Sequence, residues 1–294
     1  MNTLPSGHYL EGFFFPDFKR AFQEQEPKAF HTFHNIQISL ELLIMESSES
    51  NQQEEIKGIC YDCLRPLKSC YCKYTAPVES GIKFVILMHP KEAKHQRTGT
   101  GRLAHLCLPE SEIIMGIDFT HNKRLNDLLK DPQYFPVMLY PGPDAWNVNR
   151  EGFAEKLTDK KLLVIIIDST WFCSKKMIRL STNVNTLPKF SFANLYKSIF
   201  TFKEEPEEYC ISTIESCYYL IKEMQGKGLS PKEADPEPLM NVFKAMIKYQ
   251  LEMENKRVLG LIPNSHAKDH KYTKLKNIPE FLQKYTPKEF EEKK

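Results

Sequence analysis

The sequence predicts an α/β domain with a largely parallel sheet, preceded by a small four-cysteine module. The first observation is the alternation of apolar, strand-like runs with helix-like segments between residues 83 and 181, which is typical of parallel sheets. The second is the segment "CYDCLRPLKSCYC" at residues 60–72, which crowds its cysteines together. The third is the composition: among 294 residues, 41% are apolar and 27% are charged, as in ordinary soluble globular proteins.

Residues 1–50 precede the module as an N-terminal extension of unknown role. Residues 36–42, "IQISLEL", alternate like a half-buried strand, and the polar segment at 46–55 is typical of a linker. The start of the chain lacks the basic-then-apolar order of a signal peptide, and the run "LLVIII" at 162–167 is too short to span a membrane. We therefore expect a cytoplasmic protein whose thiols stay reduced.

The cysteine module is predicted over residues 51–80, with the spacing C-x2-C-x6-C-x-C at Cys60, Cys63, Cys70 and Cys72. Two short cysteine pairs joined by a turn suit tetrahedral zinc with four thiolate ligands. Four protein ligands leave no open position, so the zinc is expected to be structural and to fold a segment too short for its own core. An iron–sulfur cluster and unligated thiols remain alternatives, whereas disulfides are not expected in the cytosol.

The main α/β domain is predicted over residues 81–228. Residues 161–167 ("KLLVIII") are apolar at every position after the lysine, which indicates a central strand buried on both faces. A capping box, Ser212-x-x-Glu215, opens a helix at 212–224. The remaining expected strands and helices alternate along the chain: strands at 83–88, 112–117 and 136–140, and helices at 101–108, 122–131 and 170–181.

The C-terminal region, residues 229–294, is predicted to contain one helix and a Lys-rich tail, after a Gly/Pro-rich linker at 226–238. The helix is expected because apolar residues recur on one face at helical spacing. These residues are Leu239, Val242, Phe243, Met246, Ile247 and Leu251.

The net charge is only +2, but the basic residues are concentrated in two segments. Residues 161–203 carry seven Lys or Arg against one acidic residue, and residues 83–105 carry five against one. Such segments favour a polyanionic partner such as nucleic acid, although lysines also commonly solvate helix faces.

Polar residues that follow the predicted strands are candidates for chemistry, because parallel sheets bind ligands beyond the carboxyl ends of their strands. Asp168 directly follows the central strand, so its carboxylate is expected at that edge; alternatively, it caps the next helix. His89 ends the first strand in the same way, and "RTGTGRL" at 97–103 follows it. This segment can bring backbone close to an anion, but it is neither a Walker loop nor a complete dinucleotide-binding fingerprint.

Five short motifs in order resemble the DTW-domain family: the cysteine module, "HPKEAKHQRTGTGRL", "LYP", "IIDSTW" and "STIES", within about residues 58–225. The resemblance implies a tRNA-uridine aminocarboxypropyltransferase, which transfers the 3-amino-3-carboxypropyl group of S-adenosylmethionine to N3 of a tRNA uridine. It also implies a knotted, SPOUT-like fold. This chain has "TGTGR", with Gly99, where the family usually has "TNTGR", and "STIES" where "STLEA" is usual.

The resemblance also suggests roles for individual residues. Asp168 is expected to accept the N3 proton or to orient the base, and Trp171 either stacks on the uracil or belongs to the core. Lys175, Lys176 and Arg179 are expected to bind tRNA phosphates. The expected contacts of S-adenosylmethionine, some of which can instead be helix caps, are Thr100, Gly101, Arg102, Ser212, Thr213 and Glu215.

Two other functions remain open at this point. One is a SPOUT-like RNA methyltransferase that uses the same cofactor, S-adenosylmethionine, and the other is a non-catalytic RNA-binding protein with a zinc ribbon. In each case tRNA or another RNA is the expected partner, with no membrane and no obligate protein partner.

Overall fold

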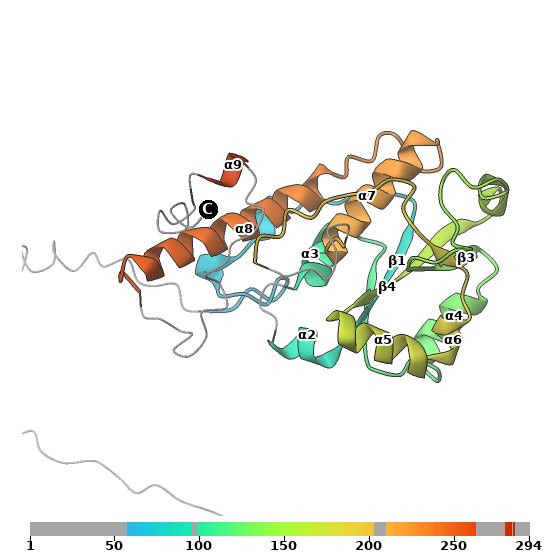
Figure 1. The fold of residues 1–294 in the computed structure, drawn as a ribbon, viewed down its shortest axis with the longest axis horizontal. Helices are drawn as coiled ribbons and strands as arrows, with labels where there is room; N and C mark the ends of the chain where they lie inside the picture. The colour runs from blue at the N-terminus through green and yellow to red at the C-terminus, as the bar shows by residue number, and fades with distance from the viewer. Residues whose placement is uncertain (1–57, 96–98, 203–209, 263–279, 284, 286–294) are drawn as a thin grey trace, which may run out of the picture. The chain divides into compact units, whose positions relative to one another are not determined.

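The computed structural model describes residues 58–95, 99–202, 210–262, 280–283 and 285, which all lie in one compact unit, residues 56–294. The strand expected at 36–42, the linker at 46–55 and most of the Lys-rich tail lie outside the described residues. A five-stranded sheet forms the centre of the unit, and all of its neighbouring strands are parallel (Figure 1). The predicted α/β class with a parallel sheet is therefore confirmed.

The sheet contains every strand that the apolar runs predict within the described residues, together with one short strand that they do not predict. The strands are β1 (Lys83–Met88), β2 (Glu112–Met115), β3 (Tyr134–Leu139), β4 (Lys161–Asp168) and β5 (Lys189–Phe190). Their order across the sheet is β2-β1-β4-β3-β5, so β4 is central, as predicted. β5 escapes prediction because it has only two residues and follows a proline, which interrupts a strand pattern.

The helices alternate with the strands and then continue to the C-terminal region. They are α2 (Pro90–His95), α3 (Thr100–Cys107), α4 (Lys123–Lys130), α5 (Trp171–Leu180), α6 (Thr182–Asn185), α7 (Thr213–Gly226), α8 (Glu237–Val258) and α9 (Glu280–Gln283). Three short 3-10 turns are η1 (Leu67–Ser69), η2 (Cys72–Tyr74) and η3 (Ala154–Leu157). Within the described part of the chain, no helix combines the length and the apolar character that a membrane span requires.

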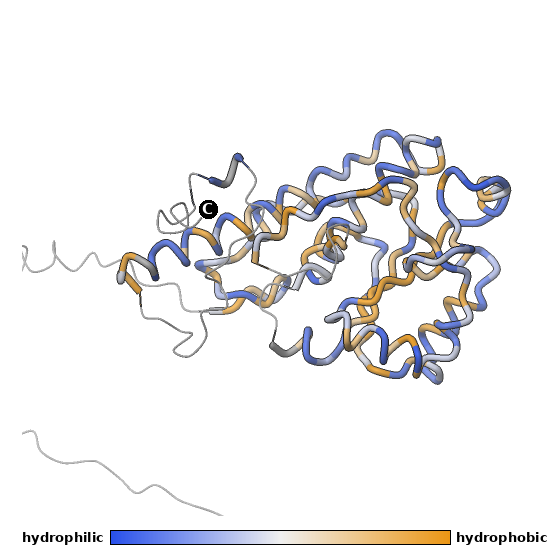
Figure 2. Tube along the Cα trace, viewed as in Figure 1, coloured by the Kyte–Doolittle hydropathy of each residue, from blue (hydrophilic) through white to orange (hydrophobic). Residues whose placement is uncertain are grey.

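Helices cover both faces of the sheet, which explains why β1 and β4 are apolar at almost every position. Alternate residues of these strands, such as Phe84 and Val164, pack against α3, α7 and α8. The intervening residues, such as Val85 and Ile165, pack against α4, α5 and α6. The two helical layers are visible in Figure 1, and Figure 2 shows the hydrophobic colouring of the strands between them.

The C-terminal helices α7 and α8 belong to the larger core cluster. The capping box predicted for α7 is present. The Ser212 side chain accepts a hydrogen bond from the backbone N–H of Glu215, the third residue of the helix, and the Glu215 side chain accepts one from the Ser212 N–H. The apolar face predicted for α8 is fully buried, since Leu239 and its five partners all have an exposed fraction of 0%. Their burial fixes α8 against the sheet domain.

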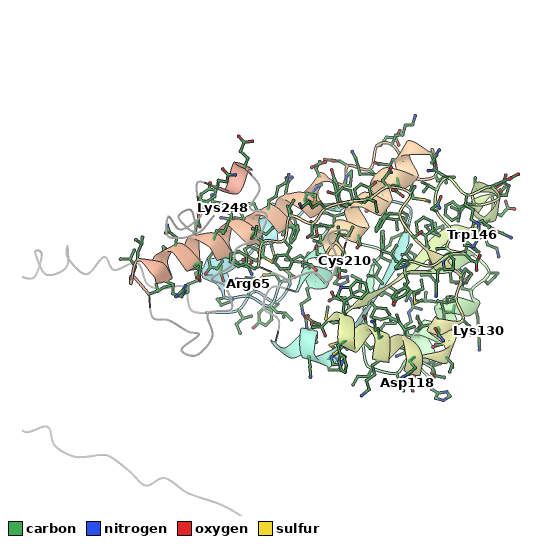
Figure 3. All side chains as sticks on the ribbon, in the orientation of Figure 1. Arg65, Asp118, Lys130, Trp146, Cys210 and Lys248 are labelled. Carbon is green, nitrogen blue, oxygen red and sulfur yellow. The ribbon has the colours of Figure 1, made fainter. Side chains whose placement is uncertain are left out.

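The cysteine module packs against α8 through an aromatic contact. Tyr71, which lies between two of the cysteines, is 3% exposed and meets Tyr249 of α8 edge to face, with ring centroids 6.2 Å apart. The Arg65 guanidinium lies 4.3 Å from the Tyr71 ring centroid, and Figure 3 labels this arginine beside α8. The module is therefore attached to the core by an aromatic ring that is stabilised by a cation.

Candidate active site and metal centre

Asp168 ends the central strand and stands at the carboxyl edge of the sheet. Its backbone pairs with Met88, the last residue of β1, and its carbonyl accepts a hydrogen bond from the His89 N–H at 3.0 Å. From β1 the chain proceeds to β2 on one side, and from β4 it proceeds to β5 on the other. Asp168 therefore lies where the winding of the sheet reverses, which is where open parallel sheets bind their ligands.

The carboxylate of Asp168 is held between two helices. Asp168 is 8% exposed, and Thr213 at the start of α7 donates its hydroxyl to Asp168 Oδ1 at 2.7 Å. Gly101 of α3 lies against the other oxygen, because a Cβ at this position would be only 2.5 Å from Asp168 Oδ2. A glycine is thus required here for close packing against a carboxylate. The structure brings the glycine-containing segment and Asp168 together.

The alternative in which Asp168 caps the following helix does not hold. The N-cap of α5 is Thr170, two residues later, and its side chain makes no capping hydrogen bond. The first turn of α5 therefore has no side-chain cap from Thr170, and Asp168 is not its N-cap residue.

A pocket of about 360 Å³ opens beside Asp168. Its lining is predominantly apolar and comes from the ends of β3, β4 and β5, the first turns of α5 and α7, and the segment 191–196. Cys210, which is labelled in Figure 3, also lines it. A mostly apolar cavity with a few convergent polar groups is the usual form of a small-molecule site.

The expected site residues divide between the pocket and its surroundings. Asp168, Trp171 and Thr213 line the pocket. Other expected contacts lie outside the lining: Thr100, Gly101 and Arg102 form the first turn of α3, and Ser212 and Glu215 form the cap of α7.

Arg102 uses part of its guanidinium to hold α2. Its Nη2 donates to the Ala93 carbonyl at 3.1 Å. A guanidinium has five N–H donors, so this bond leaves others for a ligand.

The four sulfur atoms of Cys60, Cys63, Cys70 and Cys72 all lie within 4.8 Å of one another. Cys60 and Cys72 are 3.6 Å apart at sulfur, and so are Cys63 and Cys70. Thiolates that bind one zinc at about 2.3 Å in a tetrahedron are separated by roughly 3.8 Å, so the cluster fits a tetrahedral metal ion. The predicted metal-binding cluster is therefore present.

The local backbone favours the thiolate of Cys60, whereas burial favours the neutral thiols of Cys70 and Cys72. Backbone hydrogen bonds from Cys63 and then Asp62 lower the pKa of the Cys60 thiol to about 7. Burial raises the pKa of Cys70 and Cys72, so these two would give up protons when a cation binds.

A model of the DTW domain matches residues 57–251, which is most of the chain. The match contains the cysteine cluster, Gly101, Asp168 and the pocket. The chain belongs to the DTW-domain family. Membership is consistent with a role in tRNA modification. The comparison with solved structures found no match.

One wall of the pocket in this DTW domain is held by a buried acid of α7. Glu223 is 6% exposed and accepts hydrogen bonds from the backbone N–H groups of Ala193 and Asn194, at 3.0–3.1 Å. The Tyr196 hydroxyl donates to the same carboxylate at 3.0 Å, and its ring stacks on Tyr219 at 3.8 Å. Burial raises the pKa of Tyr196 to about 12, so it remains a donor.

A second acid of α7 anchors the chain that follows this wall. Glu215 is 0% exposed, and it accepts the Ser198 hydroxyl and the Ile199 N–H, both at 2.8 Å, in addition to the Ser212 N–H and hydroxyl. All four donors come from the protein. The contacts of Glu215 therefore give it a positioning role in the DTW domain.

His89 is a site residue for which the sequence suggests a position but no role. It is 8% exposed, and its Nδ1 accepts the Lys91 N–H at 3.1 Å, so a neutral ring carries its proton on Nε2. Burial, and then the positive charges of Lys91 and Lys176, lower the pKa of His89. A neutral imidazole beside the Asp168 backbone is therefore the favoured form near pH 7.

The basic residues of α5 lie on its outer face. Lys175, Lys176 and Arg179 are all exposed, whereas Ser174, Met177 and Ile178 face the sheet. These three cations are not among the residues that line the pocket.

Proposed function

We propose that this DTW-domain protein transfers the 3-amino-3-carboxypropyl group from S-adenosylmethionine to N3 of a uridine in tRNA. The main support is a buried carboxylate, Asp168, that is fixed by Thr213 and Gly101 at the wall of a mostly apolar pocket. Family membership supports a tRNA-modifying transferase, and the site offers a carboxylate and a cavity of suitable character for this reaction.

The pocket residues fit a nucleoside-containing donor, because apolar walls accommodate an adenine and polar groups accommodate its ribose and amino acid. Bound there, S-adenosylmethionine would supply an electrophilic carbon whose bond to sulfur breaks, with neutral methylthioadenosine leaving, as uracil N3 forms the new bond. In this proposal, Trp171 packs against the uracil. The free donors of Arg102 bind the carboxylate of the transferred group.

Asp168 is the proposed general base, accepting the N3 proton of the uracil. The Thr213 hydroxyl stabilises the ionised carboxylate and sets its orientation. Thr100, Gly101, Ser212 and the buried Glu215 support this arrangement from the two flanking helices. Orientation is the main contribution, since a sulfonium needs little assistance to leave.

The metal is proposed to be zinc with a structural role, since four thiolates close its coordination sphere. Elemental analysis is expected to find zinc bound by this cluster of four cysteines, and Cys63→Ser is expected to remove it and to lower the melting temperature. A Cys173→Ser control, outside the cluster, should keep the metal. Full metal retention by Cys63→Ser would contradict this assignment.

The knotted, SPOUT-like chain path and a cytoplasmic location belong to the same proposal. Eight free cysteines among the described residues agree with a reducing compartment. The parallel sheet with its site at the carboxyl edge agrees with the proposed fold relationship.

Mass spectrometry of nucleosides from tRNA incubated with the protein and S-adenosylmethionine tests the function. We expect 3-(3-amino-3-carboxypropyl)uridine from the wild type and from Asp159→Asn, an exposed control, and none from Asp168→Ala. A methylated nucleoside would indicate an RNA methyltransferase instead. RNA binding without any modified nucleoside or affinity for S-adenosylmethionine would indicate a binding protein.

A further inference from the structure

An apolar side chain is exposed at the start of α5, beside the pocket. Phe172 has an exposed fraction of 84%, although its neighbour Trp171 lines the pocket and Asp168 precedes it by four residues. Isolated exposed apolar residues are common and carry little meaning. Phe172 is informative because of the residues that share its helix face.

Phe172, Lys175, Lys176 and Arg179 form one face of α5, here called the α5 stripe. In an α-helix, residues three, four and seven positions after Phe172 lie within about 100° of one another around the axis. All four side chains are exposed, and the opposite face is buried against the sheet. The stripe thus combines one ring with three cations on a rigid element.

The charge of the stripe is uncompensated within the described part of the chain. None of Lys175, Lys176 and Arg179 takes part in an ion pair there, whereas the nearby lysine of α4, Lys123, is paired with Asp127. The positive potential also reaches the sheet edge, because Lys176 and Lys91 contribute to the lowered pKa of His89. A cationic surface that continues to the site favours a polyanion.

Aromatic rings between cations are typical of surfaces that bind single-stranded nucleic acid, where bases stack on the rings and phosphates meet the cations. A second copy of this chain is a poorer occupant, because a two-fold contact through the stripe would oppose like charges. An apolar protein partner would bury three cations without counter-charges, which is costly.

We infer that the α5 stripe binds the RNA strand next to the target uridine, with Phe172 stacking on an unpaired neighbouring base and the three cations binding phosphates. The inference rests on the proposed function and extends it from the pocket to a positioned RNA strand. A uridine held this way would be unstacked before its ring enters the pocket.

The test compares binding of unmodified tRNA transcripts by Phe172 variants with matched controls. Phe172→Ala is expected to weaken tRNA binding roughly tenfold. Phe172→Leu should bind tRNA as weakly as Phe172→Ala, because leucine is apolar but has no ring on which a base can stack. Phe172→Trp should bind at least as tightly as the wild type. Leu259→Ala, which truncates another exposed apolar residue, is the control and should bind normally.

Charge reversal tests the second half of the stripe. The double variant Lys175→Glu, Lys176→Glu should bind tRNA with lower affinity and a shallower dependence on salt, whereas Lys156→Glu with Lys160→Glu, also exposed, should change little. Calorimetric titration with S-adenosylmethionine should give the same affinity for all of these variants.

The outcomes distinguish a failure of the stripe assignment from a failure of the proposed function. If the wild type modifies tRNA but Phe172→Ala binds tRNA normally, the stripe assignment is wrong and the function stands. If Phe172→Ala instead abolishes self-association in sedimentation while tRNA binding is retained, the stripe is an interface between copies. If the wild type binds no tRNA, both are overturned.

Discussion

Asp168 and Glu215 are both buried acids that the sequence nominates for the active site, but their surroundings differ. Asp168 lines the pocket, and Thr213 donates to one of its oxygens. Glu215 is completely enclosed, lies outside the pocket lining, and accepts four donors from the protein. Both acids lie in short motifs, so the motifs alone do not distinguish a candidate base at a pocket from an acid whose oxygens are bound by the protein itself. The contacts of the two side chains do distinguish them.

The largest effect is expected for Asp168→Asn, which removes the proposed base and nearly preserves its shape. Transfer to tRNA should fall by about 10²–10⁴-fold, the usual contribution of a positioned general base. The urea unfolding curve should change little. Wild-type activity in Asp168→Asn would show that Asp168, like Glu215, only supports the fold. The proposed difference between the two acids would then be wrong.

Glu215→Gln is expected to have the opposite effect. The N–H₂ group of the new glutamine would face the N–H and O–H donors that now bind the Glu215 carboxylate, and would leave a buried donor without an acceptor. The free energy of unfolding, measured by urea denaturation, should therefore fall by about 3 kcal/mol. The protein that remains folded at low temperature should still transfer the group. The exposed control Glu155→Gln should change stability by less than about 0.5 kcal/mol. Unchanged stability of Glu215→Gln would contradict the positioning role.

Gly101→Ala tests the packing against the Asp168 carboxylate. The added Cβ would lie 2.5 Å from Asp168 Oδ2, so the carboxylate must move, with about 1–3 kcal/mol lost and transfer impaired. Gly226→Ala is the matched control, because that glycine also lies in a helix but has nothing within 4 Å of an added Cβ. Similar stability and activity in both variants would rule out the close approach.

The smallest effect is expected for Thr213→Val, which keeps the shape but removes the hydroxyl that orients Asp168. We expect the transfer rate constant to fall about tenfold, from the loss of one hydrogen bond to a charged group, with little change in stability. Thr213→Ser should restore the rate, and steady-state kinetics would show it. A defect confined to the KM for S-adenosylmethionine would instead make Thr213 a donor contact.

Much of the fold follows from local patterns, because its strands and long helices bury continuous apolar faces. The run from Leu162 to Ile167 predicts the central strand, and the rule for parallel sheets places Asp168 at the ligand edge. The cysteine spacing likewise predicts the metal-binding cluster, because ligand geometry is set within one short segment.

The pocket wall at 191–196 could not be predicted, because it is held by Glu223, about thirty residues away in the chain. Its only local signal is an acid on the buried side of an apolar helix. Helix α2 was also not predicted, because "PKEAKH" has no apolar stripe. Its one helical signal is the initial proline, which suits a first helical position. Contacts between distant segments, rather than local propensity, create these parts of the site.

The most direct measurement is a crystal structure of the protein with S-adenosylhomocysteine, the stable analogue of the proposed donor. We expect the nucleoside to lie within the pocket that Asp168, Trp171 and Thr213 line, with its amino acid portion toward Asp168. Binding at another surface, or binding in the pocket with Asp168 turned away from the ligand, would contradict the proposed site.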